Sequence, residues 1–217
     1  MFWGSRATPW EVKKKNMVLS KKQESALVGM ILGDGFLQKT GENNARLRLE
    51  HSSKQKEYLK WKMELFPQFF QSNVKELSRI HPKTQKKYHY VRGQSTASPL
   101  LGKLRRIFYP GGGKRIPENL SRYLRHPLGL AIWYLDDGYY YARDKVIYLY
   151  LGRVALNDAK VAQKSIEERF ELKSILKDKK DKGYVLYFSP SETQKFNVLI
   201  NEFVITQMRY KLPSLTP

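Results

Sequence analysis

The sequence contains no cysteine and no long apolar run. The absence of cysteine excludes disulfides and cysteine zinc sites, and it fits a reducing compartment. No apolar run approaches the roughly 20 residues that a membrane-spanning helix requires, so we expect no membrane partner. The four histidines are never paired at metal-ligand spacing, and we predict sheet or surface positions for His51, His81, His89 and His126.

Acidic residues are few for the number of basic ones. The 217 residues include 40 Lys and Arg but only 20 Asp and Glu, which gives a formal net charge of +20. Solubility needs a net charge of only a few units, and a larger excess costs self-repulsion. The charge therefore predicts a polyanionic partner, with nucleic acid favoured over an acidic membrane. The hydrophobic fraction of 41% suffices for one compact domain or two small ones.

Two apolar segments are nearly alike, and each ends in an aspartate followed by glycine. They read LVGMILGDG at 27–35 and LAIWYLDDG at 130–138. We predict a helix for each, ended by a glycine in the left-handed conformation that a C-terminal cap favours. Asp34 and Asp137 would then lie at the negative end of the helix dipole, a placement that favours a bound cation. The matched pair predicts a duplicated protein with a paired, metal-binding acidic centre.

Both segments resemble the signature motif of the LAGLIDADG homing endonucleases, and the second resembles the second motif of monomeric, intron-encoded members. The resemblance includes Lys114-Arg115-Ile116-Pro117 and Tyr210-Lys211-Leu212-Pro213, and it covers roughly residues 21–213. It implies an α+β fold built as a tandem pseudo-twofold repeat of αββαββα units. Two curved antiparallel sheets would form a DNA-binding saddle around a central pair of motif helices.

The hydrophobic periodicity predicts the same order of elements in both halves. In the first half we predict helices at 21–32, 55–66 and 98–108, and strands at 36–38, 45–51, 74–80 and 87–92. In the second half we predict the motif helix after His126-Pro127, followed by strands at 139–142 and 146–153. The next helix is capped by Asn157 or Asp158 and ends near Phe170. A hairpin of 172–177 and 184–188 follows, and Ser189-Pro190-Ser191 opens the last helix.

The run Pro110-Gly111-Gly112-Gly113 predicts a flexible linker between the halves. We divide the chain into an N-terminal tail (1–19), a first half (20–110), a linker and connecting segment (111–125) and a second half (126–217). Residues 1–16 lack the apolar core of a signal peptide. A disordered tail, an upstream reading-frame remnant and a transit peptide all stay open for them.

Small residues in the first motif predict a close helix crossing. Gly29 and Gly33 lie four residues apart, on one face of the helix, as small residues do in tightly packed helix pairs. In the second motif Ile132 and Asp136 occupy the matching positions. We therefore expect the two motif helices to pack asymmetrically.

The predicted crossing would bring Asp34 and Asp137 within a few ångströms of each other. Two carboxylates form a hard-oxygen site suited to Mg²⁺, and the backbone carbonyls of Gly33 and Asp136 are candidate further ligands. Within the second motif the Asp136 side chain competes with Asp137 for the ligand role. The resemblance assigns that role to Asp34 and Asp137, one from each active site.

The resemblance also implies that Lys114 and Lys211 are active-site lysines, which act on water and stabilise charge at the phosphate. Glu50 is a further catalytic candidate, because the family often carries a polar residue near the water shell at the end of this strand. Its counterpart region in the second half is Gly152-Arg153, so we predict that the two active sites are not equivalent.

Alternation along the strands predicts a polar sheet face that reads DNA in the major groove. Arg46, Arg48 and Glu50 share one face of a strand, while Leu47 and Leu49 share the other with His51. A solvated outer face is the open alternative for each residue. The candidate DNA-binding residues are Arg46, Arg48, Tyr88, Tyr90, Arg92, Tyr148, Tyr150 and Arg153.

The resemblance implies a monomeric, Mg²⁺-dependent, site-specific endonuclease that acts in intron mobility. Its substrate would be a long, nearly palindromic DNA duplex, cut in both strands to leave short 3′ overhangs. We expect Mn²⁺ to substitute for Mg²⁺, and Ca²⁺ to permit binding without cleavage. An organelle, mitochondrion or chloroplast, is favoured over an archaeal or bacterial cytoplasm.

Three other functions remain open. The first is an RNA maturase that assists splicing of its host intron, with intron RNA as its partner. The second is a non-cleaving, DNA-binding regulator of the same fold, although both acidic positions are retained. The third is an unrelated nuclease built around Asp158 and Glu171-Leu172-Lys173, a short pattern that arises readily by chance in a lysine-rich chain.

Overall fold

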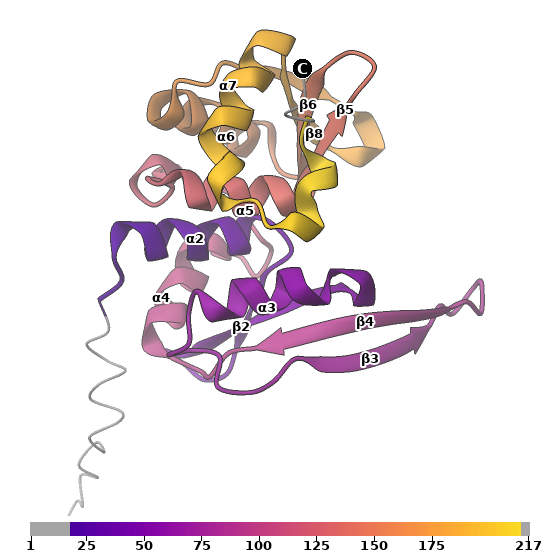
Figure 1. Ribbon diagram of the computed structural model, residues 1–217. Coiled ribbons are helices and arrows are strands. Elements are labelled where there is room, and N and C mark those ends of the chain that lie inside the picture. The colour runs from indigo at the N-terminus through magenta and orange to yellow at the C-terminus, as the bar shows by residue number, and fades with distance from the viewer. Residues whose placement is uncertain (1–17, 214–217) are drawn as a thin grey trace, which may run out of the picture.

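The computed structural model of the protein describes residues 18–213, which form two units of similar design (Figure 1). The N-terminal tail predicted at 1–19 lies outside the described residues, apart from Val18 and Leu19. Among the helices of the described part, none combines the length and the apolar character needed to cross a membrane.

Each unit follows the predicted order αββαββα. The first contains α2 (Lys21–Leu32), β1 (Phe36–Lys39), β2 (Ala45–Ser52), α3 (Lys56–Glu64), β3 (Lys75–Ile80), β4 (Lys87–Gln94) and α4 (Pro99–Phe108). The second contains α5 (Pro127–Asp137), β5 (Gly138–Tyr141), β6 (Val146–Gly152), α6 (Leu156–Phe170), β7 (Ile175–Asp178), β8 (Tyr184–Phe188) and α7 (Pro190–Ile200). The tandem α+β repeat predicted from the sequence is confirmed.

The two sheets are antiparallel and share one strand order, β1-β2-β4-β3 and β5-β6-β8-β7. Helices α3 and α4 pack on the first sheet, and α6 and α7 pack on the second (Figure 1). The strand register relates the two units. Arg48 pairs with Phe36, and Tyr148 pairs with Tyr139, each pair at the same place after the motif aspartate. Arg48 and Tyr148 are therefore matched positions.

The strand alternation follows the predicted pattern. In β2 the side chains of Leu47 and Leu49 are buried, and those of Arg46, Arg48 and Glu50 are half-buried. Successive strand residues point to opposite faces of a sheet. The apolar face of the first sheet thus supports the core, and its polar face points away from the core.

Helices α2 and α5 cross at a backbone contact between two glycines. A Cβ on Gly29 would lie 2.2 Å from the carbonyl oxygen of Gly129, and one on Gly129 would lie 2.3 Å from that of Ser25. Gly33, the second small residue of the first motif, leaves room for the Asp136 side chain, because a Cβ on Gly33 would lie 2.4 Å from Oδ2 of Asp136. The packing is asymmetric, as predicted, but the glycine opposite Gly29 lies outside the aligned motif.

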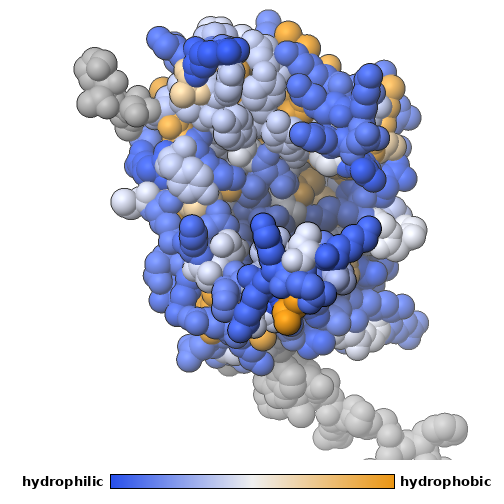
Figure 2. Space-filling model, turned by 90° about the vertical axis from the view of Figure 1, so that its right-hand side faces the viewer, coloured by the Kyte–Doolittle hydropathy of each residue, from blue (hydrophilic) through white to orange (hydrophobic). Residues whose placement is uncertain are grey.

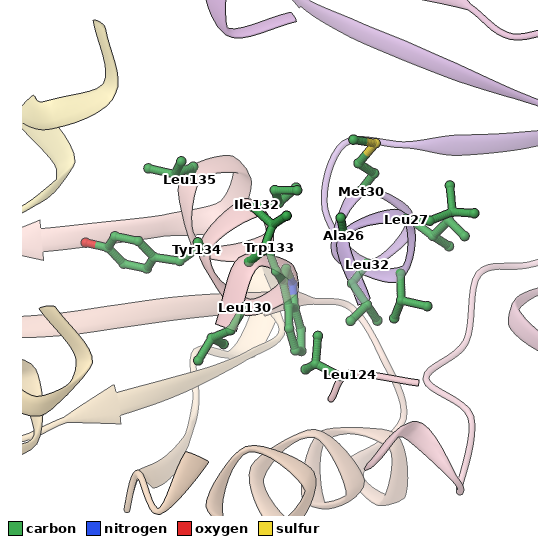
Figure 3. Close-up of a cluster of buried hydrophobic side chains, with 14 of the residues drawn as sticks. Ala26, Leu27, Met30, Leu32, Leu124, Leu130, Ile132, Trp133, Tyr134 and Leu135 are labelled. Carbon is green, nitrogen blue, oxygen red and sulfur yellow. The ribbon is translucent and has the colours of Figure 1, made fainter. Parts of the chain in front are cut away.

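Apolar side chains surround this crossing and form the core that the units share. Ala26 and Met30 of α2 and Ile132 and Trp133 of α5 are all buried (Figure 3). Each motif helix is apolar on nearly all sides because it packs against its own unit and against the other helix.

The glycines after the two aspartates are not left-handed caps, which corrects the prediction. Neither Gly35 nor Gly138 has a positive φ. A Cβ on Gly35 would lie 2.3 Å from the carbonyl oxygen of Met30, and one on Gly138 would lie 2.0 Å from a ring carbon of Tyr134. These glycines are required by the lack of space and not by backbone conformation.

Helix α6 begins earlier than predicted. Its first residue is Leu156 and its N-cap is Ala155, so neither Asn157 nor Asp158 caps it. The Asp158 carboxylate instead binds the connecting segment, accepting hydrogen bonds from Arg115 Nε at 2.6 Å and from the backbone N–H of Ile116 at 3.2 Å. This occupied carboxylate argues against a separate nuclease centre at Asp158.

The segment between the units is only partly a linker. Pro110–Gly113 is exposed, as expected for a flexible connection. The residues that follow are held in the core by Ile116, Leu120 and Leu124, all of which are buried. The connecting segment therefore belongs to the packed structure, and it is fixed well enough to position the residue at its start, Lys114.

Candidate active site

Two lysines bind the ends of the two motif helices in the same way. Lys114 Nζ donates to the carbonyl oxygen of Gly33 at 2.6 Å, and Lys211 Nζ donates to that of Asp136 at 3.1 Å. Each carbonyl belongs to the residue before the motif aspartate. An ammonium group satisfies a carbonyl that the end of a helix leaves without a partner, and it offsets the negative end of the dipole. The structure thus brings both predicted lysines to the predicted acidic centre.

The acidic and basic groups at this centre perturb one another. Burial raises the pKa of Asp34, and the neighbouring Asp136 raises it further. Burial, with smaller effects of Asp136 and Asp34, raises the pKa of Asp137 to about 7. Burial lowers the pKa values of Lys114 and Lys211. A bound cation would relieve the cost of ionising the two motif aspartates, so the donor set suits a divalent metal.

The Asp136 side chain is held by groups of the first unit. Lys62 Nζ donates to Oδ1 at 2.6 Å and to Oδ2 at 2.7 Å, and neither side chain is exposed to solvent. The Tyr58 hydroxyl donates to Oδ1 at 2.9 Å, and the backbone N–H of Asp34 donates to Oδ2 at 3.1 Å. Both oxygens are satisfied within the protein, so the Asp136 carboxylate ties the units together.

His51 lies between this ion pair and the first motif aspartate. Its Nε2 is 3.1 Å from Lys62 Nζ, and its Nδ1 is 3.4 Å from Oδ2 of Asp34. Burial, and next the Lys62 charge, lower the pKa of His51 to about 3, so the imidazole is neutral. A neutral ring can accept a hydrogen bond on one side and donate one on the other.

Ligand atoms of Asp34, His51 and Asp136 lie within 4.8 Å of one another, a spacing at which they could hold a metal. The Lys62 ammonium, however, already binds both Asp136 oxygens and contacts His51. This argues against a metal ligand role for the Asp136 carboxylate. A carbonyl oxygen has two lone pairs, so the predicted ligand roles of the Gly33 and Asp136 carbonyls stay predictions.

Glu50 lies on the polar face of the first sheet. Its Oε1 accepts a hydrogen bond from Arg92 Nε at 2.7 Å. The neighbouring His51, on the opposite face of the strand, is the side chain that reaches Asp34. A catalytic role for Glu50 stays a prediction. Its counterpart by strand register is Tyr150 and not Gly152-Arg153, because the β5–β6 hairpin is shorter than the β1–β2 hairpin.

Arginine and amide groups form the polar face of the first sheet. Gln38 Oε1 accepts hydrogen bonds from Arg46 Nε at 3.1 Å and from Arg48 Nη2 at 2.8 Å. On the next strand the Arg92 guanidinium lies 5.7 Å from the centre of the Tyr90 ring. Tyr88, further along β4, is exposed. These predicted DNA-binding residues share one face, and several of them hold each other in place.

Tyrosines dominate the matching face of the second sheet. The ring centre of Tyr148 lies 6.5 Å from that of Tyr150 and 5.5 Å from that of Tyr187. Lys177 Nζ lies 3.7 Å from the Tyr187 ring centre, and Lys179 Nζ lies 5.6 Å from that of Tyr148. This face therefore combines aromatic surface with cations.

Arg153 and one hydrophilic side of the molecule bear on the predicted DNA-binding surface. The predicted contact residue Arg153 is exposed, and its Nε donates to the carbonyl oxygen of Asp181 at 2.7 Å. The side of the molecule drawn in Figure 2 is covered mainly by hydrophilic side chains and is hollowed near its middle. Neither observation tests the predicted contacts with DNA, which stay predictions.

Sequence reasoning missed three members of the site, namely Tyr58, Lys62 and Gly129, and it placed His51 among ordinary sheet residues. A usable signal existed for Lys62. It lies four residues after Tyr58, on the same helix face as the buried Leu59 and Met63. A lysine on an apolar helix face signals a buried partner, although the sequence does not identify that partner.

A sequence profile of the LAGLIDADG DNA endonuclease family matches residues 24–196. The fold resembles that of the homing endonuclease I-WcaI bound to its DNA recognition sequence, with a TM-score of 0.84 and 24% identity. The match covers 97% of this chain and 95% of that chain.

Among curated proteins, Protein RecA of Mycolicibacterium flavescens is 31% identical over 211 residues, which cover 89% of this chain but 47% of that protein. The chain spans about half the length of such relatives. Probable intron-encoded endonuclease 1 of Wickerhamomyces canadensis is 26% identical, over 93% of this chain and 88% of that protein. Cytochrome b mRNA maturase bI2 of Debaryomyces hansenii is 23% identical, over 91% of this chain and 76% of that protein.

Proposed function

Because the chain belongs to the LAGLIDADG DNA endonuclease family, we propose that it is a site-specific homing endonuclease that cuts both strands of a long, nearly palindromic duplex as a monomer. The paired ends of α2 and α5 carry this proposal. Each presents an aspartate, Asp34 or Asp137, beside a lysine that binds the preceding carbonyl. Two such sites in one chain match the two strands of a duplex.

The proposed cofactor is Mg²⁺, with Mn²⁺ as a substitute and Ca²⁺ as a cation that permits binding only. Asp34 and Asp137 would hold it, because their carboxylates lack the ion pair that satisfies Asp136. A divalent metal supplies charge stabilisation at the phosphate and a more acidic bound water. Lys114 and Lys211 fix the backbone beside each aspartate and place positive charge where the scissile phosphate would lie.

The proposed DNA contacts are the polar faces of the two sheets. The net charge of +20 provides long-range attraction for the phosphate backbone. Arginines of the first sheet can bind guanine edges in the major groove, and tyrosines of the second sheet offer hydroxyl groups and apolar ring edges. We propose short 3′ overhangs as the product and intron mobility, in an organelle, as the biological role.

One observation favours an RNA maturase as the second candidate. The relative from Debaryomyces hansenii, similar over 91% of this chain, is named as a cytochrome b mRNA maturase. Such an activity would use the same basic fold without needing Asp34 or Asp137. It predicts binding to the host intron RNA that survives substitution of both aspartates.

Cleavage of a randomised duplex library in Mg²⁺ tests the endonuclease proposal. The wild type is compared with Asp34→Asn and Asp137→Asn, and with Asp144→Asn as a control at an exposed position. We expect a defined cleaved sequence from the wild type and the control. Each motif variant should retain binding in Ca²⁺ but lose double-strand cleavage. Binding without cleavage by the wild type would overturn the proposal, and intron RNA would be the next ligand tested.

A further inference from the structure

We propose that His51 is a positioning residue for Asp34, and that a buried chain of hydrogen bonds starting at Asp136 points the imidazole N–H at the Asp34 carboxylate. This inference rests on the proposed function, since it concerns the orientation of an acidic ligand in that active site. It assigns a role to three buried groups, Tyr58, Lys62 and His51, that the endonuclease proposal does not use.

Lys62 determines which ring nitrogen of His51 carries the proton. An ammonium group has three N–H donors and no acceptor. The three partners of Lys62 Nζ are Oδ1 of Asp136 at 2.6 Å, Oδ2 of Asp136 at 2.7 Å and Nε2 of His51 at 3.1 Å. Since the ammonium can only donate, Nε2 must be the acceptor. The proton of a neutral ring is then on Nδ1.

The Nδ1 side of the ring faces the first motif aspartate, and the Gln55 side chain is a second hydrogen-bonding neighbour of the ring. Nδ1 lies 3.4 Å from Oδ2 of Asp34, a long contact of a kind that often tightens when substrate binds. The His51 side chain is 1% exposed, and its ring centre lies 5.1 Å from that of Tyr58, so packing limits rotation of the ring. His51 thus holds one oxygen of Asp34 and leaves the other for a ligand, as partners of metal-binding carboxylates do.

The second unit has no such group at the matching position. Arg48 and Tyr148 are matched by strand register. Three residues further along each strand lie His51 and Leu151. Leu151 lies at a shift of register between Tyr150 and Gly152, and a leucine cannot donate a hydrogen bond to Asp137. Among residues 18–213 this histidine support is therefore found only at the first site, and the two sites should respond differently to substitution of His51 and of Leu151.

Separate nicking rates of the two strands test the role of His51 in solution. Asp34→Asn and Asp137→Asn first assign each strand to a site. We expect His51→Leu to slow nicking of the Asp34-dependent strand about 10–100-fold and to leave the other strand unchanged. His51→Gln should restore part of the rate, because its amide can accept from Lys62 and donate to Asp34. Leu151→Ala is the matched control and should leave the Asp34-dependent strand unchanged.

Two outcomes of the nicking experiment would overturn the inference. One is an equal loss on both strands in His51→Leu, which would mean a general structural role. The other is an unchanged rate on the Asp34-dependent strand. A double-mutant comparison adds a further requirement: His51→Leu should have no additional effect on that strand in the Asp34→Asn background.

A nitrogen-15 NMR spectrum of the histidine side chains tests the proton position without any cleavage. We expect the His51 signal, identified by its loss in His51→Gln, to be that of the neutral Nδ1–H tautomer in the metal-free wild type. An Nε2–H tautomer or a charged ring would overturn the inference. A wild type that shows Nδ1–H but cuts no DNA would refute the proposed function and leave the hydrogen-bond chain standing.

Discussion

The two units share a backbone plan but differ in the chemistry placed on it. Both end a motif helix with a lysine on the last carbonyls, and both leave a polar sheet face beyond it. Near Asp34 lie His51 and Lys62 of the first unit and the Asp136 carboxylate of the second unit. Around Asp137 the same chain offers mainly burial, which raises the pKa of that carboxyl group to about 7.

The sheet faces differ in the same way. Matched positions carry Arg48 in one sheet and Tyr148 in the other, and Glu50 corresponds to Tyr150. Duplication thus preserves the elements that set backbone geometry, while exposed and interfacial side chains diverge. Each difference between the units becomes a place where a substitution should affect one unit more than the other.

The largest expected effect is on the buried ion pair between Lys62 of the first unit and Asp136 of the second. Lys62→Met leaves the Asp136 carboxylate buried without its cation and should lower the free energy of unfolding by about 3–5 kcal/mol. The double variant Lys62→Met/Asp136→Asn removes the unpaired charge and should recover much of this loss. Urea denaturation measures both. A double variant no more stable than the single one would show that the charge itself is not the cause.

The second comparison sets Lys114 against Lys211. Each lysine binds the carbonyl beside one aspartate only, although both lysine charges act on both aspartates. Replacing either by Met should slow nicking of one strand about 10²–10³-fold, a different strand for each variant, and should slow the other strand less. The exposed Lys103→Met serves as the control for loss of a positive charge. Nicking of a supercoiled plasmid measures the rates. If both variants slowed the same strand more than the other, the proposed division into two sites would be wrong.

A smaller effect is expected from the matched pair Arg48 and Tyr148. Arg48→Gln should reduce discrimination at one base pair by about 1–3 kcal/mol, because the bidentate guanidinium contact with guanine is lost. Tyr148→Phe removes only a hydroxyl and should change discrimination by about 1 kcal/mol or less. Competitive binding of single-substitution targets in Ca²⁺ measures this, with the exposed Lys164→Gln as control. Equal effects of the two variants would contradict the difference between the faces.

The smallest effect is a pH dependence of stability that arises from the ion pair between Arg115 and Asp158 of the second unit. The hydrogen bond from Arg115 lowers the pKa of Asp158 below its ordinary value of about 3.9. Because the pKa is lower in the folded protein than in the unfolded chain, the ion pair stabilises the fold fully above the unfolded-state pKa. This stabilisation is lost as the pH falls through the folded-state pKa. The difference in Tm between wild type and Asp158→Asn should therefore be full above about pH 4 and vanish in stronger acid. Glu76→Gln, which removes the exposed ion pair with Lys56, should change Tm less than Asp158→Asn does.

The elements of the fold could be predicted because each depends on local patterns. The alternation of Arg46, Leu47, Arg48 and Leu49 specified a strand and both of its faces without reference to the rest of the chain. The start of α6 could not be predicted in this way. Asp158 has the side chain of a helix cap, but its carboxylate is bound by Arg115, which lies 43 residues away in the sequence.

In the candidate site, too, residues in local patterns could be predicted, and residues brought together by packing between the units could not. The family resemblance predicted Lys114 and Lys211, and their matched positions before Ile-Pro and Leu-Pro strengthened that prediction. The network of Lys62, His51 and Asp136 forms only where two units meet, and no local pattern encodes which lysine will face which carboxylate. The partner of Gly29 was hidden for the same reason. Packing across an interface places Gly129 there, and alignment of the two motifs does not.

The crossing of α2 and α5 also bears on how the chain is made. Residues 25–32 of α2 are all buried in the finished protein, yet their main partner is synthesised only after the whole first unit. During translation the apolar side of α2 that packs against α5 stays exposed until α5 has been synthesised. Such long-range pairing slows folding and exposes the nascent chain to aggregation. We therefore expect its yield in cells to depend on chaperones that shield hydrophobic nascent segments.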